Sequence, residues 1–138
     1  ASLRPRAGAN GGAPIVFGTL PGERHEMGLL IAALTAAAVG GRVVYLGPDL
    51  PVEELAMAVA TTEAGALALS LVARDDVQDV LAHLRALRAA LPRDVELWVG
   101  GALSDRATGI PGVTVLDSFE ALEQCVRLYT LGSGRPGV

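Results

Sequence analysis

The chain contains 138 residues, of which 51% are hydrophobic and 19% are charged, as expected for a single soluble domain that buries a core. Its net charge of −4, without any run of basic residues, argues against a nucleic-acid-binding surface. The single cysteine, Cys125, rules out an internal disulfide and a zinc site built on cysteine pairs. We therefore expect a protein of the reducing cytoplasm in which Cys125 packs in the core.

The elements follow a regular order along the chain. Glycine-rich ends predict flexible segments at residues 1–14 and 132–138 around one domain at 15–131, and we expect no signal peptide because the first segment lacks an apolar block. Short apolar runs predict strands at 15–19, 42–46, 66–70, 95–99 and 113–116. Longer periodic patterns predict helices at about 25–39, 52–62, 75–91 and 118–129, with a short piece after Leu103.

The patterns inside these elements predict how they pack. The uncharged run from Met27 to Gly41 is shorter than the about 20 residues that a membrane-spanning helix needs, so we expect a buried helix there. The strands are almost continuously apolar, as in a parallel sheet covered on both faces, with Tyr45 and Trp98 as core aromatics. The helix at 75–91 has an apolar face made by Val77, Val80, Leu81, Leu84, Leu87 and Leu91.

Alternating strands and helices predict an α/β fold, a flavodoxin-like (Rossmann-like) doubly wound sheet of five parallel strands in the order 2-1-3-4-5. Such sheets bind ligands at the carboxyl ends of their strands, where the strand order reverses beside strands 1 and 3. The loops expected there carry Glu23 and His25, Ser70 to Val72, and the pair Gly100-Gly101. The sequence therefore brings three separate motifs to one predicted crevice.

Each motif has a functional and an ordinary interpretation. A neutral imidazole can ligate a metal, and Glu23 could orient the His25 ring, but a surface histidine beside a helix-capping glutamate would give the same Glu-x-His pattern. Ser70 could bind a ligand or simply close a turn. Gly100 and Gly101 could admit a bulky ring system or form an ordinary strand-to-helix turn.

Together the motifs resemble the cobalamin-binding domain family, whose pattern is Asp-x-His-x-x-Gly, then Ser-x-Leu, then Gly-Gly. The corresponding segments here are Glu23-Arg24-His25-Glu26-Met27-Gly28, Ser70-Leu71-Val72 and Gly100-Gly101. The resemblance covers about Ile15 to Tyr129, and residues 20–50 look especially like the versions found in regulators. Two positions depart from the pattern: Glu23 replaces the usual aspartate, and Val72 replaces the leucine of Ser-x-Leu.

The resemblance implies a role for each matching residue. His25 would be the lower axial ligand of cobalt, displacing the corrinoid's own dimethylbenzimidazole in a His-on/base-off arrangement, with Glu23 orienting its ring. The displaced nucleotide tail would enter a channel beside the sheet, which Trp98 could also contact. The residues implied in cofactor binding are Glu23, Arg24, His25, Glu26, Met27, Gly28, Ser70, Leu71, Val72, Gly100 and Gly101.

The resemblance also suggests function. It implies adenosylcobalamin or methylcobalamin as cofactor and a module without turnover of its own, similar to the light- or cobalamin-responsive part of MerR-type transcription regulators. A helical bundle or other regulatory partner domain would cover the upper face of the corrin, and we expect no direct contact with nucleic acid or membrane. The alternative is a corrinoid carrier of a methyltransferase or the cobalamin subunit of a carbon-skeleton mutase. A flavodoxin or response regulator would share the fold but fits the motifs poorly.

Overall fold

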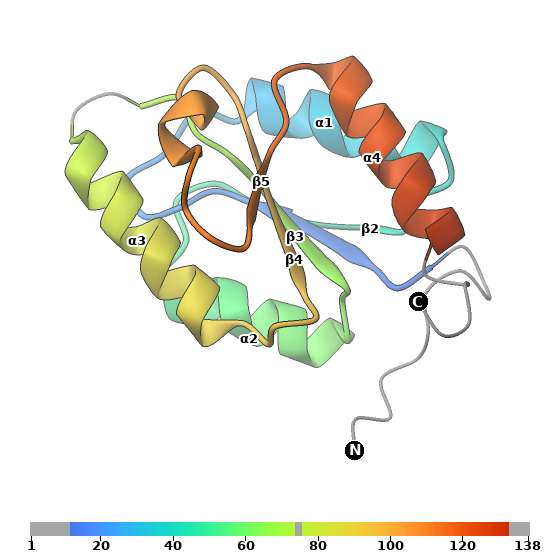
Figure 1. The fold of residues 1–138 in the computed structure, drawn as a ribbon, viewed down its shortest axis with the longest axis horizontal. Helices are drawn as coiled ribbons and strands as arrows, with labels where there is room; N and C mark the ends of the chain where they lie inside the picture. The colour runs from blue at the N-terminus through green and yellow to red at the C-terminus, as the bar shows by residue number, and fades with distance from the viewer. Residues whose placement is uncertain (1–11, 74–75, 133–138) are drawn as a thin grey trace.

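The computed structural model describes residues 12–73 and 76–132, and within them five strands form one parallel sheet in the order β2-β1-β3-β4-β5 (Figure 1). This arrangement confirms the predicted doubly wound fold and its strand order. The strands, in chain order, are β1 (Ile15–Gly18), β2 (Val43–Gly47), β3 (Ala66–Ser70), β4 (Glu96–Gly100) and β5 (Val113–Val115).

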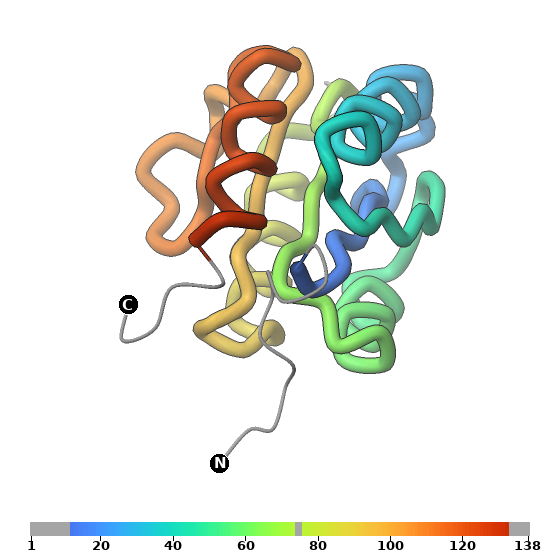
Figure 2. Tube along the Cα trace, turned by 90° about the vertical axis from the view of Figure 1, so that its right-hand side faces the viewer, coloured from blue at the N-terminus to red at the C-terminus, as the bar shows by residue number. Residues whose placement is uncertain are grey.

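The helices cover the two faces of the sheet, so the fold has three layers (Figure 1). One face carries α1 and α4, which lie side by side, and the other carries α2 and α3 (Figure 2). The bounds are α1 (Met27–Ala38), α2 (Val52–Thr62), α3 (Val77–Ala90), the 3₁₀ helix η1 (Ser104–Ala107) and α4 (Phe119–Gly132). The predicted start of the third helix, at residue 75, lies outside the described residues.

Alternation along the strands divides the core into two parts. On the α2 and α3 side, β3 contributes Leu67 and Leu69, whereas on the α1 and α4 side it contributes only Ala66 and Ala68. These small side chains lie beside Phe17 and Trp98, which are fully buried on the same side. The difference in size leaves room between the sheet and its α1/α4 layer, and the pocket described below lies there.

The third helix packs as its periodicity predicted. Its N-cap Asp76 accepts a hydrogen bond from the backbone N–H of Asp79 through Oδ1 at 3.1 Å. Leu84 and Leu87 are fully buried, and Val80 packs against the same core from a half-buried position. No helix among residues 12–73 and 76–132 is long and apolar enough to cross a membrane.

Two packing predictions are wrong. α1 is not a buried helix, because it lies in an outer layer and turns only one side toward the sheet; Met27 and Leu34 are 74% and 66% exposed. Tyr45 is not a core aromatic either, since β2 is an edge strand and the Tyr45 ring remains 36% exposed. Trp98, on the interior strand β4, is 1% exposed and confirms the prediction for that residue.

The predicted end segments lie largely outside the described residues, apart from residues 12–14 and Gly132. Ala13, within the first of them, is 4% exposed and its carbonyl accepts a hydrogen bond from the Tyr129 hydroxyl at 3.0 Å. The Tyr129 ring also packs edge-on against Trp98, with ring centroids 5.4 Å apart. Contacts between α4 and residues just before β1 therefore close this end of the core.

Candidate functional site

The carboxylate of Glu23 joins two loops at the carboxyl end of the sheet. Its side chain is 7% exposed, and Oε2 accepts hydrogen bonds from His25 Nδ1 at 2.8 Å and from the His25 backbone N–H at 3.2 Å. Oε1 accepts from the backbone N–H groups of Val72 at 2.5 Å and Ala73 at 2.7 Å. One carboxylate thus fixes both the His25 ring and the start of the β3–α3 loop.

These bonds leave the second ring nitrogen of His25 available. Because an ionised carboxylate can only accept, Nδ1 carries the proton and Nε2 of the neutral ring keeps its lone pair. Nε2 forms no hydrogen bond with the residues that the structure describes, and the side chain is 63% exposed. The helix-capping interpretation of Glu23 is wrong, since the N-cap of α1 is Glu26, which forms no side-chain cap bond. A ring oriented in this way can ligate a metal through Nε2.

A second set of bonds holds the same loop from the β2 side. The Thr19 hydroxyl, fully buried, donates to the Glu23 carbonyl at 2.7 Å and accepts from the Asp49 N–H at 2.7 Å. Asp49 Oδ1 accepts from the Gly22 N–H at 2.8 Å, and its other oxygen lies 3.8 Å from Arg24 Nε. Sequence reasoning missed Thr19, because its partner Asp49 lies 30 residues further along the chain.

The electrostatics of Glu23 follow from these contacts. Burial by itself raises the pKa of the carboxyl, but the hydrogen bonds from Ala73, Val72 and His25 together outweigh it and hold the pKa below its ordinary value of 4.5. Glu23 is therefore ionised at neutral pH. A lowered pKa in the folded state means that the carboxylate adds stability above pH 4.5, and that this stability is lost as the pH falls through the folded-state pKa.

We expect Glu23→Gln to lower the free energy of unfolding at pH 7 by about 2 kcal/mol, because an amide cannot accept on both sides and leaves a backbone N–H unpaired. The difference from the native chain should shrink as the pH falls below 4.5, because the Glu23 carboxyl of the unfolded native chain takes up a proton there while the folded carboxyl, with its lowered pKa, stays ionised to lower pH. Urea unfolding at pH 7 and pH 3.5 measures both effects. A difference that stays constant between these two pH values would show that the charge of Glu23 does not contribute to the free energy of unfolding.

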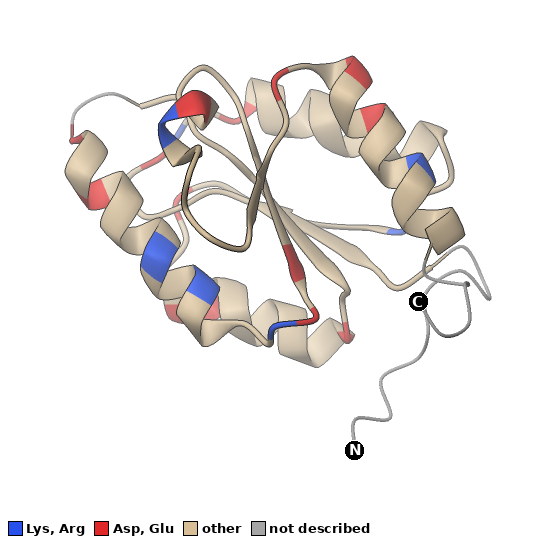
Figure 3. Ribbon diagram, in the orientation of Figure 1, with Lys and Arg blue, Asp and Glu red and all other residues tan. Residues whose placement is uncertain are grey.

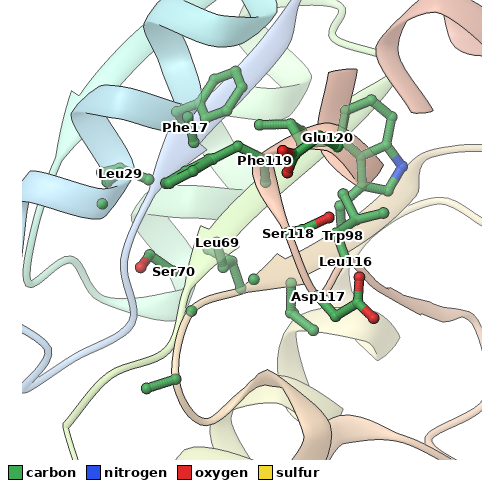
Figure 4. A pocket seen from close by; sticks show the side chains of 18 residues that line it. Phe17, Leu29, Leu69, Ser70, Trp98, Leu116, Asp117, Ser118, Phe119 and Glu120 are labelled. Carbon is green, nitrogen blue, oxygen red and sulfur yellow. The ribbon is translucent and has the colours of Figure 1, made fainter. Parts of the chain in front are cut away.

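A pocket of about 480 Å³ lies beside this loop, between α1, the sheet and the start of α4 (Figure 4). Its volume is within the range of about 300–1,000 Å³ that is usual for small-molecule sites. The side chains that form its apolar wall include Phe17, Leu29, Ala68, Trp98, Leu116 and Leu122. Asp117, Ser118 and Glu120, which also line it, are exposed and give it a polar rim. Sequence reasoning missed this rim, although Ser118 between a strand and a helix was a usable signal.

Ser70 and Gly28 bring the motif residues to the pocket. Ser70 is 7% exposed, lines the pocket and makes no side-chain hydrogen bond with any described residue, so its hydroxyl is available to a ligand. A Cβ at Gly28 would lie 3.7 Å from Ser70 Oγ, so a larger side chain there would extend into the space between them. Both observations indicate space that a ligand can occupy.

Gly100 and Gly101 line the pocket, and Gly101 also lies against the backbone of Leu71. Gly101 has φ +97°, and a Cβ there would lie 2.6 Å from the Leu71 carbonyl oxygen. The Leu71 N–H donates to the Gly100 carbonyl and its own carbonyl accepts from the Leu103 N–H, both at 2.8 Å. Gly101 therefore allows the ends of β3 and β4 to lie in contact, while Gly100 and Gly101 both line the pocket.

The predicted site residues occupy three places. Gly28, Ser70, Gly100 and Gly101 line the pocket, and Val72 contacts Glu23 through its backbone. The others in the β1–α1 loop surround His25: Arg24 beside Asp49, Glu26 accepting from the Tyr45 hydroxyl at 2.7 Å, and exposed Met27. Leu71 differs, because its side chain is 2% exposed in the core on the α2/α3 side.

Comparison with known proteins places this site in context. No protein-family model matches the chain. It is 45% identical over 113 residues, 82% of its length, to the HTH-type transcriptional repressor CarH of Myxococcus xanthus, of which it covers 38%. It also matches a solved structure described as a novel cobalamin-binding protein from Desulfitobacterium hafniense DCB-2, with TM-score 0.68 and 25% identity, covering 83% of this chain and 58% of that one. The chain belongs to the cobalamin-binding domain family.

A further solved member of this fold is the methanol:cobalamin methyltransferase complex MtaBC from Methanosarcina barkeri, with TM-score 0.74 over 96% of this chain and 50% of that one. Its 17% identity shows the shared fold alone. The Glu23-x-His25-x-x-Gly28 segment resembles the Asp-x-His-x-x-Gly pattern given above, with glutamate in place of aspartate. The longer glutamate still reaches the imidazole, and its second oxygen binds the β3–α3 loop.

Proposed function

We propose that this chain binds cobalamin, with His25 as the lower axial ligand of cobalt, and that it acts as the sensory module of a transcription regulator. The observation that carries the proposal is the bond between His25 Nδ1 and the buried Glu23 carboxylate, which leaves Nε2 free at the ligand-binding edge of the sheet. The 45% identity to a transcriptional repressor supports the regulatory part. The chain spans 38% of that relative, so a partner domain would deliver the response.

The residues present fit the cofactor. The described residues contain no group of three or more His, Cys, Asp or Glu side chains able to hold a metal ion. One imidazole suits a metal whose equatorial positions are already filled by a macrocycle. The pocket and the available Ser70 hydroxyl would receive the nucleotide tail, and bound cobalamin would supply a cobalt–carbon bond that light can break.

The surface fits a domain that acts through a partner. Among the residues that the structure describes, basic side chains are distributed over α3, η1, α4 and the loops instead of gathering on one element (Figure 3). We therefore propose that DNA contact belongs to another domain, while a helical bundle or regulatory domain covers the upper face of the corrin. The carrier alternative is not favoured, because the methyltransferase structure is only 17% identical and shows the fold alone.

Absorbance spectra test the proposal. The purified chain is mixed in the dark with adenosylcobalamin or methylcobalamin, and spectra are recorded before and after illumination. We expect the chain to retain the cofactor on gel filtration with a spectrum typical of a nitrogen ligand on cobalt and, for a light sensor, a further change on illumination. A bound but light-insensitive cofactor would favour sensing of cobalamin supply, and an unchanged spectrum with no retention of cofactor on gel filtration would reject cobalamin binding.

Gly28 provides a steric test of the pocket. We expect Gly28→Leu to weaken cobalamin binding by about 10-fold or more, because its side chain would occupy the space beside Ser70. Gly28→Ala is the matched control: its Cβ meets Ser70 Oγ at an ordinary 3.7 Å, so binding should persist. Equilibrium dialysis measures the affinities. Equal affinities for both variants would show that the pocket beside Gly28 does not receive the cofactor.

A further inference from the structure

The buried wall of the pocket is apolar apart from one group. Of the lining residues that are buried, only Ser70 has a polar side chain other than the Trp98 indole. The Trp98 Nε1–H already donates to Glu96 Oε1 at 2.9 Å. The backbone of β1, β3 and β4 along this wall is committed to the parallel ladder, in which Phe17 pairs with Ala68 and Ala68 with Trp98. The buried side chains of the wall therefore offer a ligand one available hydroxyl and otherwise apolar surface.

The other polar side chains that line the pocket, apart from Ser70 and the Trp98 indole, lie at its rim. Asp117, Ser118 and Glu120 are exposed, and the Ser118 hydroxyl accepts a hydrogen bond from the Ala121 N–H at 3.0 Å. Figure 4 shows these rim residues and Ser70 entering the pocket from different elements. A group buried against Phe17 and Trp98 would thus contact mainly apolar side chains.

This distribution bears on which nucleotide base the pocket accepts. Base-off dimethylbenzimidazole has one ring nitrogen free to accept a hydrogen bond and two methyl groups, which match one hydroxyl and an apolar wall. Adenine presents an amino group and additional ring nitrogens. Burying those groups without partners carries their full desolvation cost, whereas methyl groups gain from burial.

We propose that the pocket selects corrinoids by their nucleotide base, accepting an apolar benzimidazole and discriminating against a purine. The selectivity rests on the proposed function, since it concerns the same site, but it makes a separate claim about the ligand class. The residues that carry it are Ser70, as the one available polar side chain of the wall, and the apolar surfaces of Phe17, Ala68 and Trp98.

The test compares the affinities of three corrinoids for the native chain by equilibrium dialysis. The ligands are cobalamin, adeninylcobamide (the same corrin with adenine as its base) and cobinamide, which lacks the nucleotide. We expect adeninylcobamide to bind about 10- to 100-fold more weakly than cobalamin, and cobinamide also to bind more weakly than cobalamin. Equal affinities for cobalamin and adeninylcobamide would overturn base selection. Equal affinities for cobalamin and cobinamide would show that the pocket gains nothing from the base, with the proposed function intact.

A polar group added to the wall should reduce the discrimination. Ala32 lines the pocket from α1, and we expect Ala32→Ser to bring the affinities for cobalamin and adeninylcobamide closer by at least about 3-fold. Ala37→Ser is the matched control, because Ala37 lies on the same helix but is exposed and outside the pocket lining. An identical ratio of the cobalamin affinity to the adeninylcobamide affinity in both variants would contradict the proposal. Failure of all three corrinoids to bind the native chain would reject the proposed function and base selection together.

Discussion

His25→Ala should change the absorbance spectrum of the cobalamin-loaded chain from that of cobalt with a nitrogen ligand to that of cobalt with water in the lower position, and weaken cofactor binding by about 100-fold or more. The physical reason is that Nε2 of His25 is the one ring nitrogen that the Glu23 carboxylate holds oriented but leaves unbonded. Without it, and with the cofactor's own base held in the pocket, water would take the lower position on cobalt. Absorbance spectra in the dark and equilibrium dialysis measure the two effects.

His83→Ala provides the control for this prediction. His83 is the other histidine of the chain and lies on α3, away from the residues that line the pocket. Its replacement should leave both the spectrum and the affinity unchanged. If the spectrum of the bound cofactor is unchanged in His25→Ala, His25 is not the axial ligand, and a similar loss of binding in both variants would indicate general unfolding.

Gly101→Ala is expected to lower the free energy of unfolding by about 3 kcal/mol. Two effects add: φ is +97°, a conformation that strains any residue with a Cβ, and that Cβ would lie 2.6 Å from the Leu71 carbonyl oxygen. Backbone atoms cannot move aside as the end of a flexible side chain can. Urea unfolding of the cofactor-free chain measures the loss.

Gly109→Ala separates the two effects. Gly109 has φ +95°, close to that of Gly101, but a Cβ there would meet nothing within 4 Å. We expect a loss of about 1 kcal/mol from backbone strain alone. If the two variants lose the same stability, then the close approach of Gly101 to Leu71 is not a constraint on the fold.

The fold followed from the sequence because its signals are local. Continuous apolar runs such as Ala66–Ser70 can be satisfied only by strands covered on both faces, and the helical patterns between them supply the covering layers. The errors arose where local pattern does not decide burial. α1 is apolar around most of its circumference, yet an outer layer of a sandwich buries only the side that faces the sheet, here Leu29, Ala33 and Ala36.

The candidate site was predictable in part. The Glu23-x-His25 spacing placed the two side chains within reach of each other, and the structure shows their contact at 2.8 Å. The partners of Glu23 Oε1 lie 49 and 50 residues further along the chain, so no local pattern could indicate them. Thr19 and Asp49, which support the loop from its other side, were missed for the same reason.

Periodicity and short-range spacing act within each segment, so the order of the elements, the parallel sheet and the motif residues follow from the sequence alone. Contacts between distant segments decide which oxygen of Glu23 accepts from which loop, that Leu71 faces the core, and that the Leu71 backbone, just after β3, requires glycine at residue 101. The pocket also belongs to this second group. Its wall exists because Ala68, Phe17 and Trp98 from three strands meet on one face of the sheet, and the space left by a small side chain depends on its neighbours across strands.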